Sequence, residues 1–183
     1  MTDKIKRRAI ESAMRDGTIL GMLWIATFSV SIVMLKSIGN GGSLILSLAV
    51  TILTLSSPVL AYKLAVKHRN SECNGTIGYG ESWMHIFVMY LCAILLSSII
   101  QFIFYAYIDP HIFGDLIPAF AKLAAESGLG TNDIEIFTQL FTSMEKMSAA
   151  EIVMSQLSGH VTRSIILTTF IAIAVKKNPK NNI

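Results

Sequence analysis

The sequence has few of the residues on which small secreted or metal-stabilised domains depend. Its two cysteines, Cys73 and Cys92, form neither a disulfide framework nor the paired spacing of a zinc site. Only 15% of its 183 residues are charged, against about 25% in an average soluble domain. Lysines and arginines stand in clusters between long apolar runs, which argues against a basic surface for nucleic acid. These absences exclude the disulfide-stapled, zinc-stabilised and nucleic-acid-binding classes.

Apolar residues are what the chain has in excess, with 52% hydrophobic residues and a mean hydropathy of +0.57. Four segments are long enough to cross a hydrocarbon core of about 30 Å. They are residues 17–35, 44–66, 83–108 and 152–175. The first is longer than the apolar part of a signal peptide, and no small-residue cleavage site follows it. The sequence therefore predicts an all-α integral membrane protein, in which residues 1–183 form a single domain with four transmembrane helices.

Local signals indicate where two of these helices end or begin. Asp109 precedes Pro110, and a residue before proline is disfavoured in the helical region, so the third helix should stop there. Ser148 and Glu151 have the spacing of a capping box, so the fourth helix should begin near residue 149. Gly17 and Gly21 allow either close packing against another helix or simply a helix start.

The segment between the third and fourth spans, about residues 111–147, does not have the composition of a plain loop. Apolar residues recur there at helical spacing on both sides of the sequence "GLGT", at residues 128–131. We therefore expect two amphipathic helices on the outer side, each too short to cross the bilayer. They lie on the membrane surface or fold over the bundle as a cap. Their polar faces have few lysines, which favours the cap.

The distribution of positive charge predicts the orientation. An even number of spans places both termini on one side, and eleven lysines and arginines fall on that side against three on the other. Loops rich in lysine and arginine stay in the cytoplasm. We therefore expect a multi-pass protein of the bacterial inner membrane with both termini in the cytoplasm and the helical cap outside.

Two polar stripes interrupt the apolar runs in the outer half of the membrane. The first is Gln101, Tyr105 and Asp109 on the third helix, and the second is Gln156, His160 and Arg163 on the fourth. Polar groups at membrane depth turn away from lipid, so the stripes should face each other with Arg163 reaching toward Asp109.

Three interpretations of this cluster remain open. The first is a structural ion pair that orients two helices. The second is a pocket for an anionic ligand, such as a lipid phosphate, with Arg163 as the charge and His160 as its helper. The third is a catalytic site in which His160 and Asp109 act as base and orienter, but no nucleophile has a recognisable setting.

No cofactor or metal site is expected. Glu81 and His85, four residues apart, are the one pair with metal-ligand spacing, but no second pair accompanies them. A solvated contact at the membrane interface is the interpretation we favour for this pair.

The chain resembles a known family over nearly its whole length in the layout of its spans, and the specific part of the resemblance lies around the third helix. The sequence "NGTIGYGESWMHIFVMYLCAIL" leads from a small-residue turn into the span, which ends in "YAYIDP". With Gly78, Gly80, Tyr107, Asp109 and Pro110, it resembles the domain-of-unknown-function 4199 family of small bacterial inner-membrane proteins. The resemblance implies a four-helix membrane protein and no established activity.

Two functions are compatible with these observations. The first is a non-enzymatic helix-bundle subunit or scaffold, with membrane lipids and either a membrane-protein partner or further copies of the chain around it. The alternative is a protein that binds or transports a lipid or small solute with the outer polar cluster. A ligand site should leave a cavity around His160 and Arg163, whereas a structural pair should be sealed.

Overall fold

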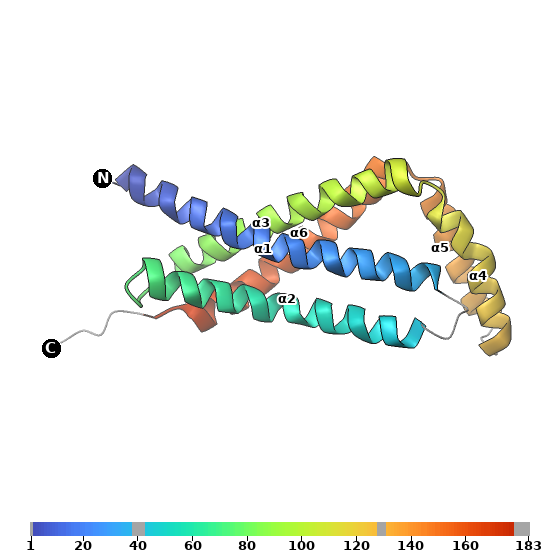
Figure 1. The fold of residues 1–183 in the computed structure, drawn as a ribbon, viewed down its shortest axis with the longest axis horizontal. Helices are drawn as coiled ribbons and strands as arrows, with labels where there is room; N and C mark the ends of the chain where they lie inside the picture. Colours follow the sequence, from blue (N-terminus) through green and yellow to red (C-terminus); the bar gives the residue numbers. More distant parts are fainter. Residues whose placement is uncertain (1, 38–42, 128–130, 178–183) are drawn as a thin grey trace.

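The computed structural model describes residues 2–37, 43–127 and 131–177, and in these ranges the chain forms six α-helices and one π-helical turn. They are α1 (Thr2–Lys36), α2 (Ser43–Glu72), α3 (Tyr79–Ile103), η1 (Phe104–Ile108), α4 (Ile112–Ser127), α5 (Thr131–Glu145) and α6 (Ala149–Val175). By length and composition, four helical segments could cross a membrane: Ala9–Lys36, Ile45–Glu72, Tyr79–Ile108 and Ala149–Val175. The prediction of an all-helical protein with four such helices is confirmed (Figure 1).

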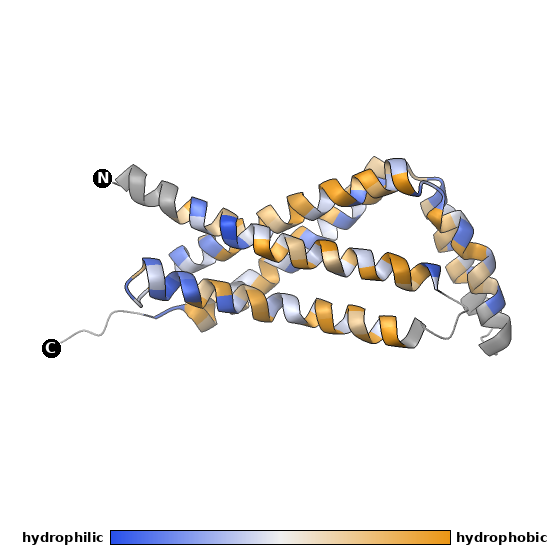
Figure 2. Ribbon diagram, in the orientation of Figure 1, coloured by the Kyte–Doolittle hydropathy of each residue, from blue (hydrophilic) through white to orange (hydrophobic). Residues whose placement is uncertain are grey.

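The long helices extend past their apolar runs at the end of the bundle where both termini lie. α1 begins at Thr2, α2 continues to Glu72 and α3 begins at Tyr79. Figure 2 shows many hydrophilic residues of the long helices gathered at this end, with mostly apolar residues along the rest of their length. The polar residues that flank the apolar runs in the sequence therefore belong to the same long helices.

The predicted helix ends have the expected local chemistry. Ser148 caps α6, because its hydroxyl accepts a hydrogen bond from the Glu151 backbone N–H at 3.3 Å. The Glu151 carboxylate in turn accepts from the Ser148 backbone N–H at 2.7 Å, which completes the capping box. The third span leaves the helical conformation at Asp109, as the following proline predicts, after the π-helical turn η1.

Glycines set the closest approach between helices. α1 packs against both α2 and α3, and α3 packs against α6. A Cβ built on Gly17 would lie 2.6 Å from the Met89 carbonyl oxygen and 2.7 Å from Cys92 Cβ on α3. A Cβ on Gly21 would lie 2.9 Å from Leu96 Cδ2. Of the two expectations for this glycine pair, close helix packing is confirmed.

The buried apolar side chains form two clusters along the bundle. The first joins α1, α2, α3 and α6 and includes Leu20, Ala61, Ile86, Met89, Tyr90, Ala93, Ala172 and Val175. The second lies toward α4 and consists of Ile32, Tyr105, Ile112, Phe113, Leu116, Ile152 and Val153. The cavity described below is lined by residues from the four long helices.

α4 and α5 lie together across the end of the bundle opposite the termini (Figure 1). α4 contributes Ile112, Phe113 and Leu116 to the second apolar cluster. Two helices between the third and fourth spans were predicted, and this is confirmed. Most of the predicted break at residues 128–131 lies outside the described residues.

One carboxylate ties the end of α5 to the beginning of α4. Glu145 accepts hydrogen bonds from the Gly114 backbone N–H at 2.8 Å and from His111 Nδ1 at 3.0 Å. The hydrogen bond with Glu145 raises the pKa of His111 above its usual 6.5. The same bond holds the pKa of Glu145 below its usual 4.5, with a further contribution from the Gly114 N–H.

These opposite shifts predict a pH window for the α4–α5 contact. The histidine contribution is fully present below about pH 6.5 and is lost as the pH rises through the raised pKa. The glutamate contribution is present above about pH 4.5 and is lost as the pH falls through the lowered pKa. We expect the Gly114 amide to be better protected from hydrogen exchange at pH 6 than at pH 8, after correction for the intrinsic exchange rate. The same pH dependence in His111→Ala would contradict this assignment.

Candidate functional site

Four of the six predicted site residues line one cavity of about 340 Å³ between the long helices. They are Gln101 on α3 and Gln156, His160 and Arg163 on α6. Tyr105 is buried beside this group, and its hydroxyl accepts a hydrogen bond from Gln156 Nε2 at 3.4 Å. The two polar stripes therefore lie close together as predicted, except at Asp109.

The expected pairing of Arg163 with Asp109 is wrong. Asp109 forms its ion pair with Lys36, the last residue of α1. α1 and the third span end near each other, so the lysine at the end of α1 reaches the carboxylate that ends η1. The sequence shows Lys36 directly after the first apolar span, but no local spacing or motif connects it with Asp109.

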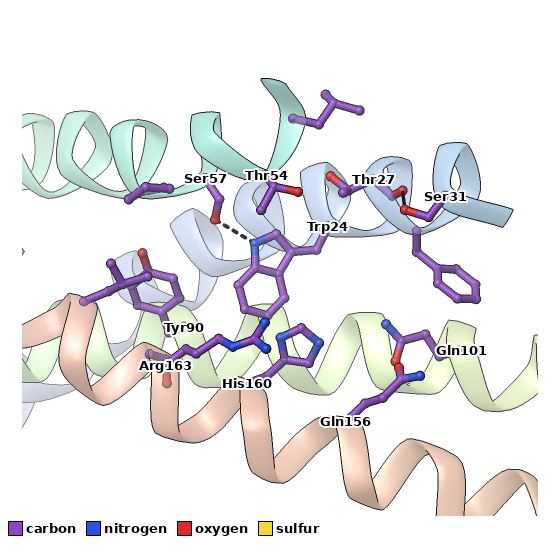
Figure 3. Close-up of a pocket in the computed structure, with 15 residues that line it drawn as sticks. Trp24, Thr27, Ser31, Thr54, Ser57, Tyr90, Gln101, Gln156, His160 and Arg163 are labelled. Atoms are coloured by element: carbon purple, nitrogen blue, oxygen red, sulfur yellow. Dashed lines mark hydrogen bonds between the residues drawn. The ribbon is translucent and has the colours of Figure 1, made fainter. Parts of the chain in front are cut away.

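Arg163 is left without a protein anion. Among the residues that the structure describes, no carboxylate lies within ion-pair distance of its guanidinium, and the guanidinium makes no hydrogen bond. Arg163 is exposed and lies in the cavity wall. Figure 3 shows Arg163 and His160 reaching from α6 toward Trp24 on α1. Arginine at membrane depth is costly unless it finds a polar partner or water.

Aromatic residues form much of the facing wall. The Trp24 indole N–H donates to Ser57 Oγ on α2 at 2.8 Å, and its ring lies 5.0 Å from the His160 ring between centroids. Tyr90 is fully buried, and its hydroxyl has no hydrogen-bond partner among the described groups. Trp24, Ser57 and Tyr90 were not among the site residues predicted from the sequence. A tryptophan within an apolar span was the available signal, because a buried indole N–H requires a partner.

The hydroxyl groups of the cavity wall are not arranged for nucleophilic chemistry. The hydroxyls of Thr27, Ser31, Thr54 and Ser164 each donate to a backbone carbonyl three or four residues earlier in the same helix. None of these hydroxyls is hydrogen-bonded to His160 in the described ranges. In the part of the chain that the structure describes, these four hydroxyls are therefore not paired with an adjacent base.

Glu81 and His85, the weak metal pair of the sequence, contact different groups in the structure. Glu81 accepts from the Gly78 backbone N–H at 3.3 Å and caps α3. His85 turns inward and lies 3.4 Å from Asp16 on α1, so it is not the solvated contact that we expected. Across residues 2–37, 43–127 and 131–177, no group of three or more His, Cys, Asp or Glu side chains is placed to hold a metal ion.

Comparison with known proteins gives one match. A family model described as a protein of unknown function (DUF4199) matches residues 15–177. No curated protein and no solved structure matches the chain.

Proposed function

The chain belongs to the DUF4199 family, whose function is unknown, and from this premise we propose that it is a membrane protein that binds an anionic amphiphile in the cavity beside Arg163. The observation that carries the proposal is the guanidinium in the cavity wall, which has no carboxylate partner in the described part of the chain. A helix-bundle scaffold would not require a cavity at this position.

The cavity wall matches the two parts of such a ligand. A drug-sized ligand site has a volume of about 300–1,000 Å³ and is mostly apolar with a few placed polar groups. This cavity, at about 340 Å³, lies within that range, and apolar atoms form most of its lining. Arg163 supplies the charge for a phosphate or carboxylate, and the amides of Gln101 and Gln156 supply further hydrogen bonds. The apolar remainder of the wall suits the first part of an alkyl chain.

We further propose that both termini are cytoplasmic and that the protein lies in a bacterial inner membrane, with the cavity in the outer half of the bilayer. The excess of lysine and arginine on the side of the termini supports this orientation. A topology reporter fused after Ile183 is expected to be active only in the cytoplasm, and one inserted near Gly128 only outside. The reverse pattern at both positions would overturn the orientation.

Binding of the amphiphile can be followed through Trp24, which is the only tryptophan left in a Trp83→Phe background. We expect dodecyl phosphate to change the Trp24 fluorescence of the purified protein in maltoside micelles, and dodecylphosphocholine to bind at least tenfold more weakly. Arg163→Gln should weaken dodecyl phosphate binding by about 10–100-fold, because a hydrogen bond to a charged group contributes about 1.5–3 kcal/mol.

The matched control is Lys122→Gln, which removes a positive charge from exposed α4, away from the cavity. This variant should bind dodecyl phosphate like the wild type. Equal affinity of the wild type and Arg163→Gln would contradict the proposal, as would equal affinity for the two amphiphiles. Inorganic phosphate alone tests the source of the anion, and tight binding of it would show that the site takes a free anion instead of a lipid.

A further inference from the structure

A second polar cluster lies at the end of the bundle where the termini are, and it combines residues from three helices. Asp16 on α1 is 1% exposed, and His85 on α3 and His68 on α2 are each 5% exposed. The His68 and His85 rings are stacked, with centroids 3.8 Å apart and planes at 12°. His85 Nε2 lies 3.4 Å from Asp16 Oδ2, within ion-pair distance but without hydrogen-bond geometry.

The hydrogen bonds around His68 determine which ring nitrogen carries its proton. Ser12 Oγ donates its one hydrogen to Glu72 Oε1 at 3.0 Å, because an ionised carboxylate only accepts. Ser12 Oγ also lies 3.0 Å from His68 Nδ1, so it must accept from an Nδ1–H. His68 Nε2 faces the Cys73 Sγ at 3.6 Å. His68 is therefore either the neutral Nδ1–H tautomer or the doubly protonated imidazolium.

The charge of His85 follows from the burial of Asp16. A carboxylate removed from water is very costly unless an opposite charge or several hydrogen bonds compensate it. Asp16 Oδ1 has no hydrogen-bond partner among the described groups, and Arg15 approaches it only to 3.6 Å with a largely exposed side chain. The buried group beside Asp16 is His85, which supplies the missing charge when it is protonated.

We propose that Asp16, His85 and His68 form a binding site for a single proton, held on His85 as an imidazolium beside the Asp16 carboxylate. The stacked His68 is then the neutral Nδ1–H tautomer, because two imidazolium rings at this separation repel strongly. The charged groups around the stack are Arg15 and Asp16 from α1 and Glu72 from α2, whose Oε2 lies 3.5 Å from His68 Nδ1.

A cavity reaches one of the two stacked histidines. This cavity of about 810 Å³ is lined by Ala9, Glu11, Ser12, Arg15, His68, Ser71, Glu72 and Cys73. His68 is the residue of the stack that this cavity reaches, and protonation of its Nε2 at low pH would place a second positive charge on the stack. The two stacked histidines therefore take up protons in order, His85 first and His68 second.

Two other assignments of this cluster are less consistent with the structure. A thiol nucleophile at Cys73 would need a low pKa, but burial raises the pKa of the Cys73 thiol, and Glu81 and Glu72 raise it further. Transfer of the thiol proton to His68 would also stack two cations. A metal centre is not supported either, because the described residues hold no group of three suitable ligands.

The 183-residue chain has four histidines, so ¹⁵N NMR of the imidazole rings in micelles can test the site directly. At pH 7 we expect His85 to carry protons on both nitrogens and His68 to be neutral with its proton on Nδ1. Asp16→Asn should make His85 neutral at the same pH. His85→Phe keeps a stacked ring without charge and should raise the proton affinity of His68 more than tenfold. This estimate follows because two unit charges so close repel by several times the thermal energy, even at an effective dielectric constant of about 20.

The control variant is His111→Gln, at the opposite end of the bundle, which should leave the His68 and His85 signals unchanged. A neutral His85 in the wild type at pH 7 would overturn the proposal. So would a His68 that takes up its proton at the same pH in the wild type and in His85→Phe. If Asp16→Asn does not fold, the wild-type spectrum and His85→Phe still decide the question.

Discussion

Gly17→Ala is expected to destabilise the protein by about 1–3 kcal/mol, the usual cost of forcing extra atoms into a packed interior. The added methyl group would lie 2.6 Å from the Met89 carbonyl oxygen and 2.7 Å from Cys92 Cβ, so α1 and α3 would have to separate. Alanine favours a helix over glycine by about 1 kcal/mol, which offsets only part of the loss. Gly17→Leu should disrupt the packing of α1 against α3 altogether.

Two other glycines provide graded controls for this effect. At Gly21 the nearest atom to an added Cβ is Leu96 Cδ2 at 2.9 Å, the far end of a flexible side chain, so Gly21→Ala should cost less. At Gly159 in α6 nothing lies within 4 Å, so Gly159→Ala should be neutral or stabilising by up to about 1 kcal/mol. Unfolding in mixed micelles measures the three variants. Equal stabilities of Gly17→Ala and Gly159→Ala would contradict the close packing.

The second large effect concerns the buried pair of Asp16 and His85. We expect the single substitutions of the two residues to destabilise the protein by different amounts. His85→Leu leaves the Asp16 carboxylate buried without its partner. Removing one partner of a buried ion pair typically costs about 3–5 kcal/mol, because an uncompensated charge stays away from water. Asp16→Asn leaves a histidine that can be buried as a neutral imidazole, so no uncompensated charge remains. His85→Leu should therefore be much the more destabilising change.

The same reasoning predicts how pH changes the result. Because acid protonates carboxylates, the defect of His85→Leu relative to the wild type should be smaller at pH 5 than at pH 7. The double variant Asp16→Asn/His85→Leu should be more stable than His85→Leu alone at pH 7. The free energy of unfolding of the four proteins at both pH values tests these statements. A pH-independent defect in His85→Leu would show that the carboxylate is already compensated, with Arg15 as the nearest other cation.

The helices of this protein were largely predictable because their determinants are local. Four apolar segments of sufficient length indicated the four long helices, and the pair Asp109–Pro110 indicated where the third span ends. The capping box of Ser148 and Glu151 likewise depends on residues only three apart. Such signals survive in the sequence because a backbone hydrogen bond or a proline ring acts within one helical turn.

Part of the candidate site was predictable from the sequence, because the spacing of residues within one helix is local. The placement of one helix against another is not. Helical spacing placed Gln156, His160 and Arg163 on one face of α6, and the cost of polar groups in lipid turned that face inward. Neither argument specifies how far one helix slides or rotates against another. Asp109 was therefore paired with Arg163, whereas the end of α1 brings Lys36 to it.

The sequence by itself determined the number, length and approximate ends of the helices, together with the polar residues that cannot face lipid. Only the tertiary structure decided which of those residues meet. Asp16 and His68 lie beside the apolar runs of α1 and α2, His85 lies near the beginning of that of α3, and the three have no shared spacing in the chain. They become one buried cluster because α1 and α2 continue as helices past their apolar runs, and because Gly17 lets α1 approach the α3 backbone closely. The contact between two helices depends on the shapes of both surfaces at once, so neither segment read alone contains it.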